Sequence, residues 1–441
     1  MKTITKIVFL IMVLFLGAQL NAQEKWTLKH CIEYAIKNNM DIKQTGIQDK
    51  IASESLSQSK RNLLPSIGAS SGVGLSFGRS VDPNTNIITN TRYFNNSYSA
   101  SASVNIFDGF NSLNQIEYQK FRKRASELNR LNAIDDLAFS IMGLYFNVLY
   151  YEGVSKIAKE QVEASKINLR KTERQVELGL KSKTDQIEMS ANLEKEELNR
   201  IQIENGLKKT MLQLKQQMNL TDKVELVLEP EQSVAVATEN PDQESLFLAF
   251  TQWSPYYQSQ LIQMYQSRTM LAMSRSQVYP SISAYGSLGT GYYKNVSEPG
   301  VAFKTQFKNN LGESLGASLS IPIFSRLSGR SGIKLAKLNV EESKTKLDQE
   351  KQKLYFEMIN NLNDLEALEK EYNQNEKRQA AEQLVYEAAV KKLEQGLISV
   401  VDFYIAKNTL ANTNSQVLQA KLQWEIKKKV LDFYSGKRFW E

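Results

Sequence analysis

Few side chains in this sequence have the type and spacing that enzymatic or metal chemistry needs. The 441 residues contain one histidine, His30, and one cysteine, Cys31, which are adjacent. A single imidazole cannot form a multi-histidine metal site, and a single thiol has no second thiol for a disulfide. A serine–histidine–aspartate triad would have to use His30, close to the start of the chain. We therefore interpret His30 as helix surface and Cys31 as helix core, and we predict no enzyme, no metal site and no cofactor.

The charge balance disfavours nucleic acid as a partner. The 55 basic and 48 acidic residues give a formal charge of +7, which falls to about +5 without Lys2 and Lys6 of the predicted leader. This charge is spread thinly, whereas nucleic-acid binding requires a dense basic patch. We expect no nucleic-acid partner.

The first residues predict export. Residues 1–22 contain Lys2 and Lys6, then an apolar run from Ile7 to Leu16, then a small residue, Ala22, at the expected cleavage site. This is the order of a secretory signal peptide. No later stretch reaches the roughly 18–20 apolar residues of a membrane helix, so we expect no membrane crossing by a helix.

Proline and glycine show which elements must position any site. No proline occurs between Pro83 and Pro230 or after Pro322, and 13 of the 21 glycines lie in residues 66–110 and 280–332. Such a distribution predicts long uninterrupted helices that alternate with short glycine-rich regions. At ~1.5 Å per residue the longest helices would reach about 100 Å. Leucine stripes at spacings of three and four indicate that these helices pack as coiled coils.

The chain is a tandem duplication of a unit near 215 residues. Three landmarks recur in the same order at offsets of 215, 217 and 217: Leu64–Ile67 as Tyr279–Ile282, Ile106–Asp108 as Ile323–Ser325, and Glu177–Leu180 as Glu394–Leu397. A shared offset identifies repeated structural units.

Each repeat has the predicted order helix, strand, strand, long helix, long helix. The first repeat, 23–220, contains a helical pattern at 26–62, strands 66–78 and 97–107, and helices 111–178 and 184–220. The second repeat, 243–435, contains a helical pattern at 243–277, strands 281–293 and 311–323, and helices 328–395 and 400–434. Residues 221–242 form the predicted linker, and residues 436–441 a short tail.

The strand-like segments carry the pattern of membrane strands. In 98–106, apolar residues alternate with Ser99, Ser101, Ser103 and Asn105. A soluble antiparallel sheet with one wet face has the same period. The polar side here is serine, glycine and asparagine rather than lysine and glutamate, which favours transmembrane strands around a crowded lumen. Single-chain barrels need at least about eight strands, so the four strands predicted here would have to combine with those of other chains.

Together these residues resemble the TolC family of trimeric outer-membrane efflux ducts. The resemblance covers nearly the whole mature chain. It rests on the duplicated unit, on Leu64-Pro65-Ser66-Ile67, on Ile106-Phe107-Asp108-Gly109, and on two Gly-Leu turns with an aspartate six residues after the glycine, Gly179/Asp185 and Gly396/Asp402.

The resemblance implies a fold, a function and partners. The fold would be mainly α with a membrane β part: a homotrimer whose twelve-stranded β-barrel is continuous with a long α-helical coiled-coil barrel. Such a protein lies in the outer membrane, contacts its lipid and extends into the periplasm. It is the passive exit duct of a tripartite efflux or type I secretion system. Its partners are a periplasmic adaptor and an inner-membrane pump of RND or ABC type.

The resemblance also implies two sets of site residues. The adaptor-docking tips correspond to Gly179, Leu180, Gly396 and Leu397. The glycines could equally serve only as tight turns. The periplasmic pore constriction corresponds to Asp402, Ile398, Ile405 and Asp185. Only Asp402 matches the family prototype's gate, so closure here could be apolar. Three Asp402 side chains could form a cation-favouring ring, or each could simply cap a helix.

One rival from another class stays open at this stage. The chain could be a periplasmic structural or adaptor coiled coil whose serine-rich segments form a soluble sheet. Within the conduit class, the sequence leaves drug, metal and protein substrates open.

Overall fold

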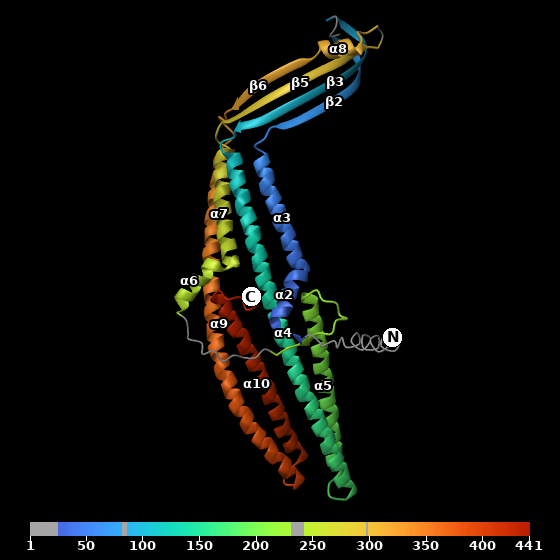
Figure 1. The fold of residues 1–441 in the computed structure, drawn as a ribbon, viewed down its shortest axis with the longest axis vertical. Coiled ribbons are helices and arrows are strands. Elements are labelled where there is room, and N and C mark those ends of the chain that lie inside the picture. Colours follow the sequence, from blue (N-terminus) through green and yellow to red (C-terminus); the bar gives the residue numbers. More distant parts are fainter. Residues whose placement is uncertain (1–24, 82–85, 231–241, 297–298) are drawn as a thin grey trace, which may run out of the picture. The chain divides into compact units, whose positions relative to one another are not determined.

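The computed structural model describes residues 25–81, 86–230, 242–296 and 299–441 (Figure 1). The predicted signal peptide, 1–22, and residues 231–241 of the predicted linker lie outside the described residues. The chain forms two compact units. Unit 1 contains the residues up to Gly46 together with Arg130–Pro255 and Lys351–Glu441, and unit 2 contains Ile47–Asn129 and Tyr256–Glu350.

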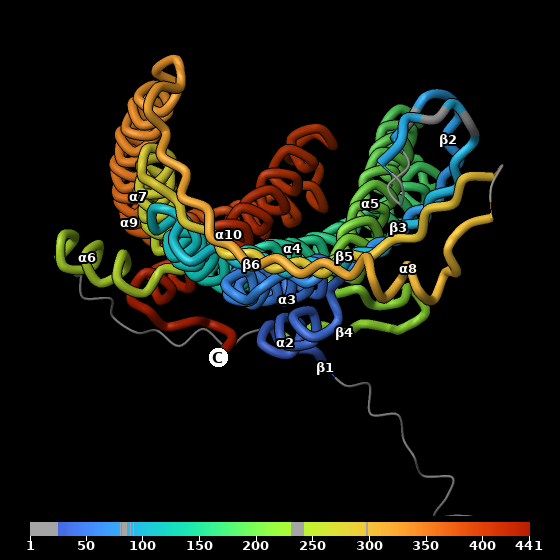
Figure 2. Tube along the Cα trace, turned by 90° about the horizontal axis from the view of Figure 1, so that it is seen from above, coloured from blue at the N-terminus to red at the C-terminus, as the bar shows by residue number. Residues whose placement is uncertain are grey.

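Unit 2 contains a four-stranded antiparallel sheet. Its strands are β2 (Ser66–Val81), β3 (Ile88–Phe107), β5 (Ser281–Asn295) and β6 (Gly312–Ser320), hydrogen-bonded in the order β2-β3-β5-β6 (Figures 1 and 2). Each repeat supplies one hairpin, and the two hairpins join along β3 and β5. The outer strands β2 and β6 each have one edge that no described strand of the chain pairs.

The sheet has two chemically different faces. Because cross-strand partners share a face, the register groups the side chains. The apolar face carries Ile67, Ala69, Val73, Leu75, Phe77, Ala100, Ala102, Val104, Leu288, Leu315 and Leu319. The serine face carries Ser66, Ser70, Ser99, Ser101, Ser103, Ser283, Ser287, Ser314 and Ser318.

Hydroxyl pairs hold the serine face together, while much of the apolar face is exposed. Hydroxyl oxygens lie 2.7–3.0 Å apart in the pairs Ser66–Ser103, Ser70–Ser99 and Ser287–Ser314. On the opposite face Leu315 is 92% exposed and Ile67 is 81% exposed. The alternation predicted from sequence therefore separates apolar from hydroxyl side chains across the sheet.

Several predicted strand limits are wrong. β3 begins at Ile88 rather than at residue 97, because 88–96 pairs along β2 out to Val81 even though its asparagines break the apolar alternation. β2 likewise ends at Val81 rather than at 78, and β5 at Asn295 rather than at 293. β6 spans 312–320 instead of 311–323; Pro322 has no N–H to donate to a sheet.

The segment between β5 and β6 is not wholly a loop. It contains a short helix, α8 (Phe303–Asn309). Phe303 and Phe307 are one turn apart, so both rings reach Tyr98 of β3. Packing against the sheet thus stabilises a helix that is too short to form alone.

The helical pattern that opens each repeat is two helices rather than one. α2 (Leu28–Asn38) and α3 (Met40–Arg61) are separated at Asn39, whose side-chain oxygen accepts hydrogen bonds from the N–H groups of Asp41 and Ile42. α6 (Gln243–Trp253) and α7 (Pro255–Ser276) are separated at Ser254, since the residue before a proline disfavours helical geometry. The break recurs at the repeat offset, with or without a proline.

Four long helices complete the chain. α4 (Asn111–Glu177) and α9 (Ser328–Glu394) have 67 residues each, and α5 (Lys183–Gln217) and α10 (Val400–Tyr434) have 35 each. α5 ends before the predicted residue 220 because Asn219 adopts a left-handed φ of 54° and Leu220 N–H closes the helix on the Lys215 carbonyl. Within the described part of the chain, no helix combines the length and apolar character that crossing a bilayer requires.

The core of unit 1 includes the first described elements of the chain. β1 (Lys25–Trp26) pairs in parallel with β4 (Val227–Leu228), and the Tyr145 hydroxyl donates to the Trp26 carbonyl at 3.2 Å. Cys31 is fully buried in this core, and burial raises the pKa of its thiol to about 12. His30 packs on the Trp26 ring at 4.4 Å between centroids. A thiol with this pKa stays protonated and unreactive at neutral pH.

Candidate functional site

The two helix–turn–helix tips of unit 1 are built alike. One tip joins α4 to α5 and the other joins α9 to α10. In each turn a glycine, Gly179 or Gly396, has a φ of +72°, and a Cβ there would meet nothing within 4 Å. The following N–H groups, of Leu180 and Leu397, donate to the carbonyls of Gln175 and Lys392 at 2.8 Å. The glycines are thus explained by backbone conformation rather than by lack of space.

The leucines that follow these glycines face solvent. Leu180 is 71% exposed and Leu397 is 68% exposed. Leucines exposed at matching positions on both tips are available for apolar contact with a partner. The structure therefore places all four predicted tip residues on accessible turns.

Asp185 and Asp402 cap the helices that follow the turns. Ser182 donates its N–H and hydroxyl to Asp185, at 3.1 and 2.9 Å, and its hydroxyl accepts from the Asp185 N–H. Ser399 and Asp402 repeat the arrangement, with the hydroxyl contact at 2.7 Å. These are two complete capping boxes. The capping role that the sequence left open for Asp402 is therefore present, and Asp185 shares it.

The other two predicted constriction residues differ in environment. Ile405 follows Asp402 by one turn on α10, and both side chains are exposed. Ile398 instead packs against a small buried cluster that includes Met189, Phe403 and Tyr404. An exposed strip on α10 thus contains Asp402 and Ile405 but not Ile398. Asp185 bonds to the serine of its own turn on the other tip.

A buried lysine next to this cluster was not anticipated from the sequence. The Lys407 side chain on α10 is 1% exposed. Its Nζ donates to the Gln161 carbonyl at 2.8 Å, to the Ser165 hydroxyl and to the Glu196 carboxylate at 2.9 Å. The Tyr404 ring lies 5.4 Å from the ammonium, and its hydroxyl is 3.2 Å from Ser165. One cation thus links α4, α5 and α10.

The electrostatics of this lysine follow from its burial. Burial lowers the pKa of Lys407, while the Glu196 carboxylate opposes the shift. A buried charge is tolerated only when its hydrogen-bonding capacity is met, as the three acceptors do here. The sequence contains a signal for this buried lysine. Lys407 is the one charged residue in a run with the spacing of a coiled-coil seam, Val400, Phe403, Lys407 and Leu410.

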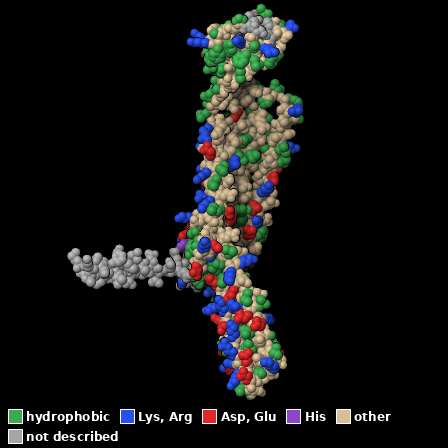
Figure 3. Space-filling model, turned by 90° about the vertical axis from the view of Figure 1, so that its right-hand side faces the viewer, with side chains coloured by type: hydrophobic (Ala, Val, Ile, Leu, Met, Phe, Trp, Pro, Cys, Tyr) green, Lys and Arg blue, Asp and Glu red, His purple; other side chains and the backbone are tan. Residues whose placement is uncertain are grey.

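The arrangement offers binding and packing rather than acid–base or metal chemistry. Across 25–81, 86–230, 242–296 and 299–441 there is no group of three or more His, Cys, Asp or Glu side chains that could hold a metal ion. In Figure 3 hydrophobic side chains gather over the sheet of unit 2, whereas Lys, Arg, Asp and Glu are dense over the helices of unit 1.

Comparison with known proteins gives consistent matches. The profile of the outer membrane efflux protein family matches residues 31–220 and 258–437. Among solved structures, the CusC channel is 17% identical, with a TM-score of 0.78 over 93% of this chain and 92% of its own. The Campylobacter jejuni CmeC outer membrane channel is 19% identical, with a TM-score of 0.79 over 93% of this chain and 86% of its own. The outer membrane protein VceC from Vibrio cholerae is 13% identical, with a TM-score of 0.78 over 93% and 96%. Comparison with curated protein sequences finds no match.

Proposed function

Because the chain belongs to the outer membrane efflux protein family, we propose that its working form is a homotrimer that serves as the exit duct of a tripartite efflux or type I secretion system. It is an outer-membrane channel with a long helical extension into the periplasm. The resemblance to the TolC family that the sequence indicated is thereby confirmed. The conduit interpretation is favoured over the periplasmic coiled-coil rival.

The observation that carries the trimer is a sheet whose two outer strands each have an edge that no described strand pairs, and whose apolar face is largely exposed. The apolar face suits contact with hydrocarbon, where each unpaired backbone N–H or C=O would cost several kcal/mol. β2 and β6 must then find partners outside the chain. Pairing β6 of one protomer with β2 of the next satisfies both edges and closes a barrel from three chains.

The tips supply the proposed docking surface for a periplasmic adaptor, which in turn would connect the duct to a pump of RND or ABC type. Leu180 and Leu397 are exposed on matching turns held by the same backbone bonds. Two rigid, similar, apolar tips in one protomer give a partner repeated contact points around a trimer.

The strip on α10 supplies the proposed constriction. Asp402 and Ile405 are exposed on neighbouring turns, and symmetry would repeat them three times around an axis. The carboxylates would favour cations, and the isoleucines would narrow the passage without charge. Ile398 supports this strip from the buried side, and Asp185 holds the companion tip.

Cysteine cross-linking across the strand edges tests the trimer. We would introduce one cysteine on β2, at Ser66 or Ser70, and one on β6, at Ser318 or Ser320, in all four combinations. Cys31 is buried and would not react. We expect disulfide-linked trimers in the outer-membrane fraction for at least one pair, and none for the single variants. A protein recovered in the soluble periplasm, or no interchain product from any pair, would refute the duct.

A second experiment tests adaptor docking. Leu180→Asp and Leu397→Asp should abolish efflux while heat-sensitive trimers remain in the outer membrane, because a carboxylate cannot replace an apolar contact. Leu198→Asp, at an exposed leucine in the middle of α5, is the control and should retain efflux. Normal drug resistance in both tip variants would count against the docking role.

A further inference from the structure

The short helix α8 is fixed on the apolar face of the sheet. Gln306 is buried and forms two bonds with β5: it accepts from the Tyr293 N–H at 2.9 Å and donates to the Tyr293 carbonyl at 2.8 Å. The Thr290 hydroxyl donates to the Phe307 carbonyl at 2.6 Å. The Asn310 amide donates to the Gly291 carbonyl at 2.8 Å. α8 is therefore a rigid part of unit 2.

An aromatic cluster lies under α8 and remains partly open. Phe307 and Phe303 lie 5.5 and 6.5 Å from Tyr98, between ring centroids, and Phe303 lies 5.3 Å from Tyr292. Both phenylalanines are exposed despite these contacts. Aromatic side chains that are apolar on one side and reach polar groups on the other are typical of membrane–water interfaces.

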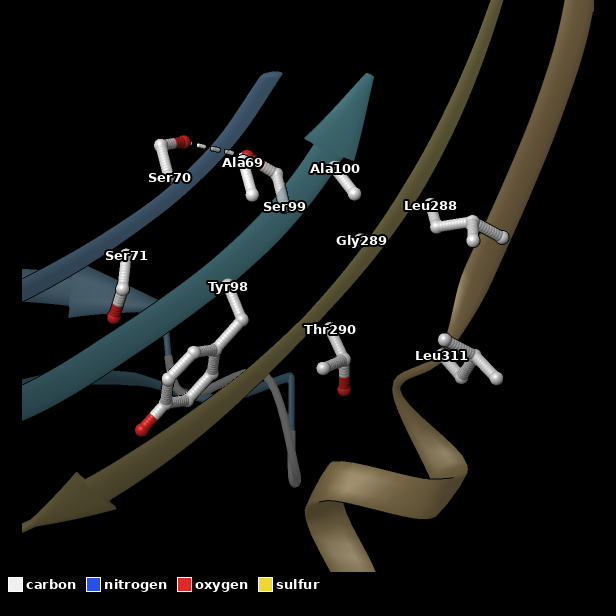
Figure 4. Close-up of a pocket in the computed structure, with 10 residues that line it drawn as sticks. All are labelled: Ala69, Ser70, Ser71, Tyr98, Ser99, Ala100, Leu288, Gly289, Thr290 and Leu311. Carbon is white, nitrogen blue, oxygen red and sulfur yellow. Dashed lines mark hydrogen bonds between the residues drawn. The ribbon is translucent and has the colours of Figure 1, made fainter. Parts of the chain in front are cut away.

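A trough runs along the apolar face away from α8. Beside the helix is a hollow of about 430 Å³, whose lining includes Ala69, Tyr98, Ala100, Leu288, Thr290 and Leu311 (Figure 4). A second hollow, of about 570 Å³, shares Ala100 and Leu288 and continues along the strands to Ile67, Ala102, Gly286 and Leu315. The second hollow is lined by small residues at Ala100, Ala102 and Gly286 and by large apolar ones at Ile67, Leu288 and Leu315.

Three lysines lie on α8 and next to Tyr293, the β5 residue that Gln306 of α8 bonds. Lys304 and Lys308 are exposed on α8, and Lys294 is exposed on β5, where the register places it beside Phe94 on the apolar face. The described residues of 281–311 contain these three lysines and no acidic residue, whereas Glu313 of β6 lines the second hollow. Glu298 lies outside the described residues. A positive cluster next to an apolar trough and exposed aromatic rings fits a lipid with an anionic head group.

Topology places α8 at one leaflet. β5 follows α7 and β6 precedes α9, so the helices connect at one end of the hairpin and α8 closes the other. With the helices in the periplasm, as the proposed function requires, α8 lies at the outer leaflet. The anionic lipid of that leaflet is a phosphorylated glycolipid.

We propose that α8 and the trough form a binding site for an outer-leaflet phosphorylated glycolipid. The phosphate lies against Lys294, Lys304 and Lys308, and one acyl chain lies in the trough over Ala100. The proposal rests on the proposed function, since the site has its ligand only in the outer leaflet.

Native mass spectrometry of the purified trimer with defined lipids tests the site. The variant Lys294→Gln/Lys304→Gln/Lys308→Gln removes the charges, and Lys334→Gln/Lys337→Gln/Lys344→Gln removes the same charge from α9 as the control. We expect the first variant to bind diphosphorylated lipid A on the order of 100-fold more weakly and the control to bind it as the parent does. Dephosphorylated lipid A and phosphatidylglycerol should bind the parent weakly.

A second variant tests the trough independently of charge. The phenylalanine side chain of the Ala100→Phe variant would project from the apolar face and fill the trough without disturbing the fold. This variant should bind phosphorylated and dephosphorylated lipid A more weakly than the parent does. Unchanged lipid A binding in the lysine variant or in Ala100→Phe overturns the site, as does equal binding of phosphatidylglycerol. Those results in an intact outer-membrane trimer overturn the lipid site alone, whereas absence of a membrane trimer overturns the proposed function with it.

Discussion

The two tips of unit 1 are copies of one turn, but the helices that follow them are packed very differently. Both have a left-handed glycine, an exposed leucine and a serine–aspartate capping box. Beyond the box, α10 buries Phe403, Tyr404 and Lys407. The residues 217 positions earlier on α5 are Gln186, Ile187 and Ser190, and the last two are exposed. The two repeats share the residues that fix the backbone of the turn, but the side-chain packing of the following helices differs.

The difference is confined to the first turns after the capping boxes, where α10 buries side chains at positions that are exposed or half-buried on α5. A helix held by a buried cation to two others is fixed in position, since moving it would expose or unpair the charge. α5 is tied to the same cation through Glu196, but its first turns leave Ile187 and Ser190 exposed and available to a partner. Mutations on α5 and α10 would show whether the buried side chains of α10 make its first turns more stable than those of α5.

The largest effect is expected at the buried ion pair. Glu196→Gln leaves the Lys407 charge buried without its counter-charge and should lower the free energy of unfolding by about 3–5 kcal/mol. Thermal unfolding of the purified trimer and hydrogen exchange along α10 would measure it. Glu194→Gln, an exposed glutamate on the same helix, is the matched control. Equal behaviour of the two variants would show that α10 is not held by this charge.

A smaller loss of stability, equal at the two tips, is expected when either turn glycine is replaced. Gly179→Ala and Gly396→Ala force an L-residue into a φ of +72°, which costs roughly 1–2 kcal/mol. Asparagine tolerates this conformation better than alanine does, so Gly→Asn at either position should lower the stability less than Gly→Ala. Hydrogen exchange of the turn amides would compare the tips. A clearly larger loss at one tip would mean that packing, and not only backbone conformation, selects its glycine.

The capping serines should give the next effect. Ser182→Ala and Ser399→Ala each remove one cap, at a cost of about 1 kcal/mol. We expect faster amide exchange in the first turn of α5 and of α10. The increase should stay more local in α10, because Phe403 and Lys407 hold its next turn. Fraying that spreads equally far along both helices would argue that the buried cluster does not restrain α10.

The smallest change in stability, with a distinct functional readout, is expected at the aspartates. Asn keeps an oxygen that accepts from serine, so Asp402→Asn and Asp185→Asn should cost only about 0.3–1 kcal/mol. Reversal potentials of single channels in a salt gradient would then report the charge alone. We expect lower cation selectivity for Asp402→Asn and less change for Asp185→Asn. Unchanged cation selectivity in Asp402→Asn would refute the proposed ring of three Asp402 carboxylates.

Local features could be predicted from the sequence, and long-range ones could not. The turns and caps depend on residues within a few positions, so Gly179, Gly396 and the paired aspartates were identifiable by their spacing. Lys407 depends on Glu196, which is 211 residues away, and no periodicity relates the two. A lysine in an apolar seam was the only signal, and it does not name its partner.

The sheet shows the same limit. Alternation predicted the two faces, because side chains of a strand point to opposite sides by geometry. The first part of β3 was missed because asparagines interrupt its alternation, whereas pairing with β2 fixes it. α8 was missed because two phenylalanines in a polar segment become a helix only against Tyr98.

The serine face has a consequence for permeation. Its hydroxyls bond to one another across the strands, and it carries dipoles in place of fixed charges. If this face lines the passage, a solute of either sign crosses that stretch without a strong field to attract or repel it. The barrel segment would then be indifferent to what passes, and added salt would scarcely alter its conductance preference. Discrimination between solutes would then depend on other parts of the duct, such as the α10 strip where Asp402 and Ile405 are exposed.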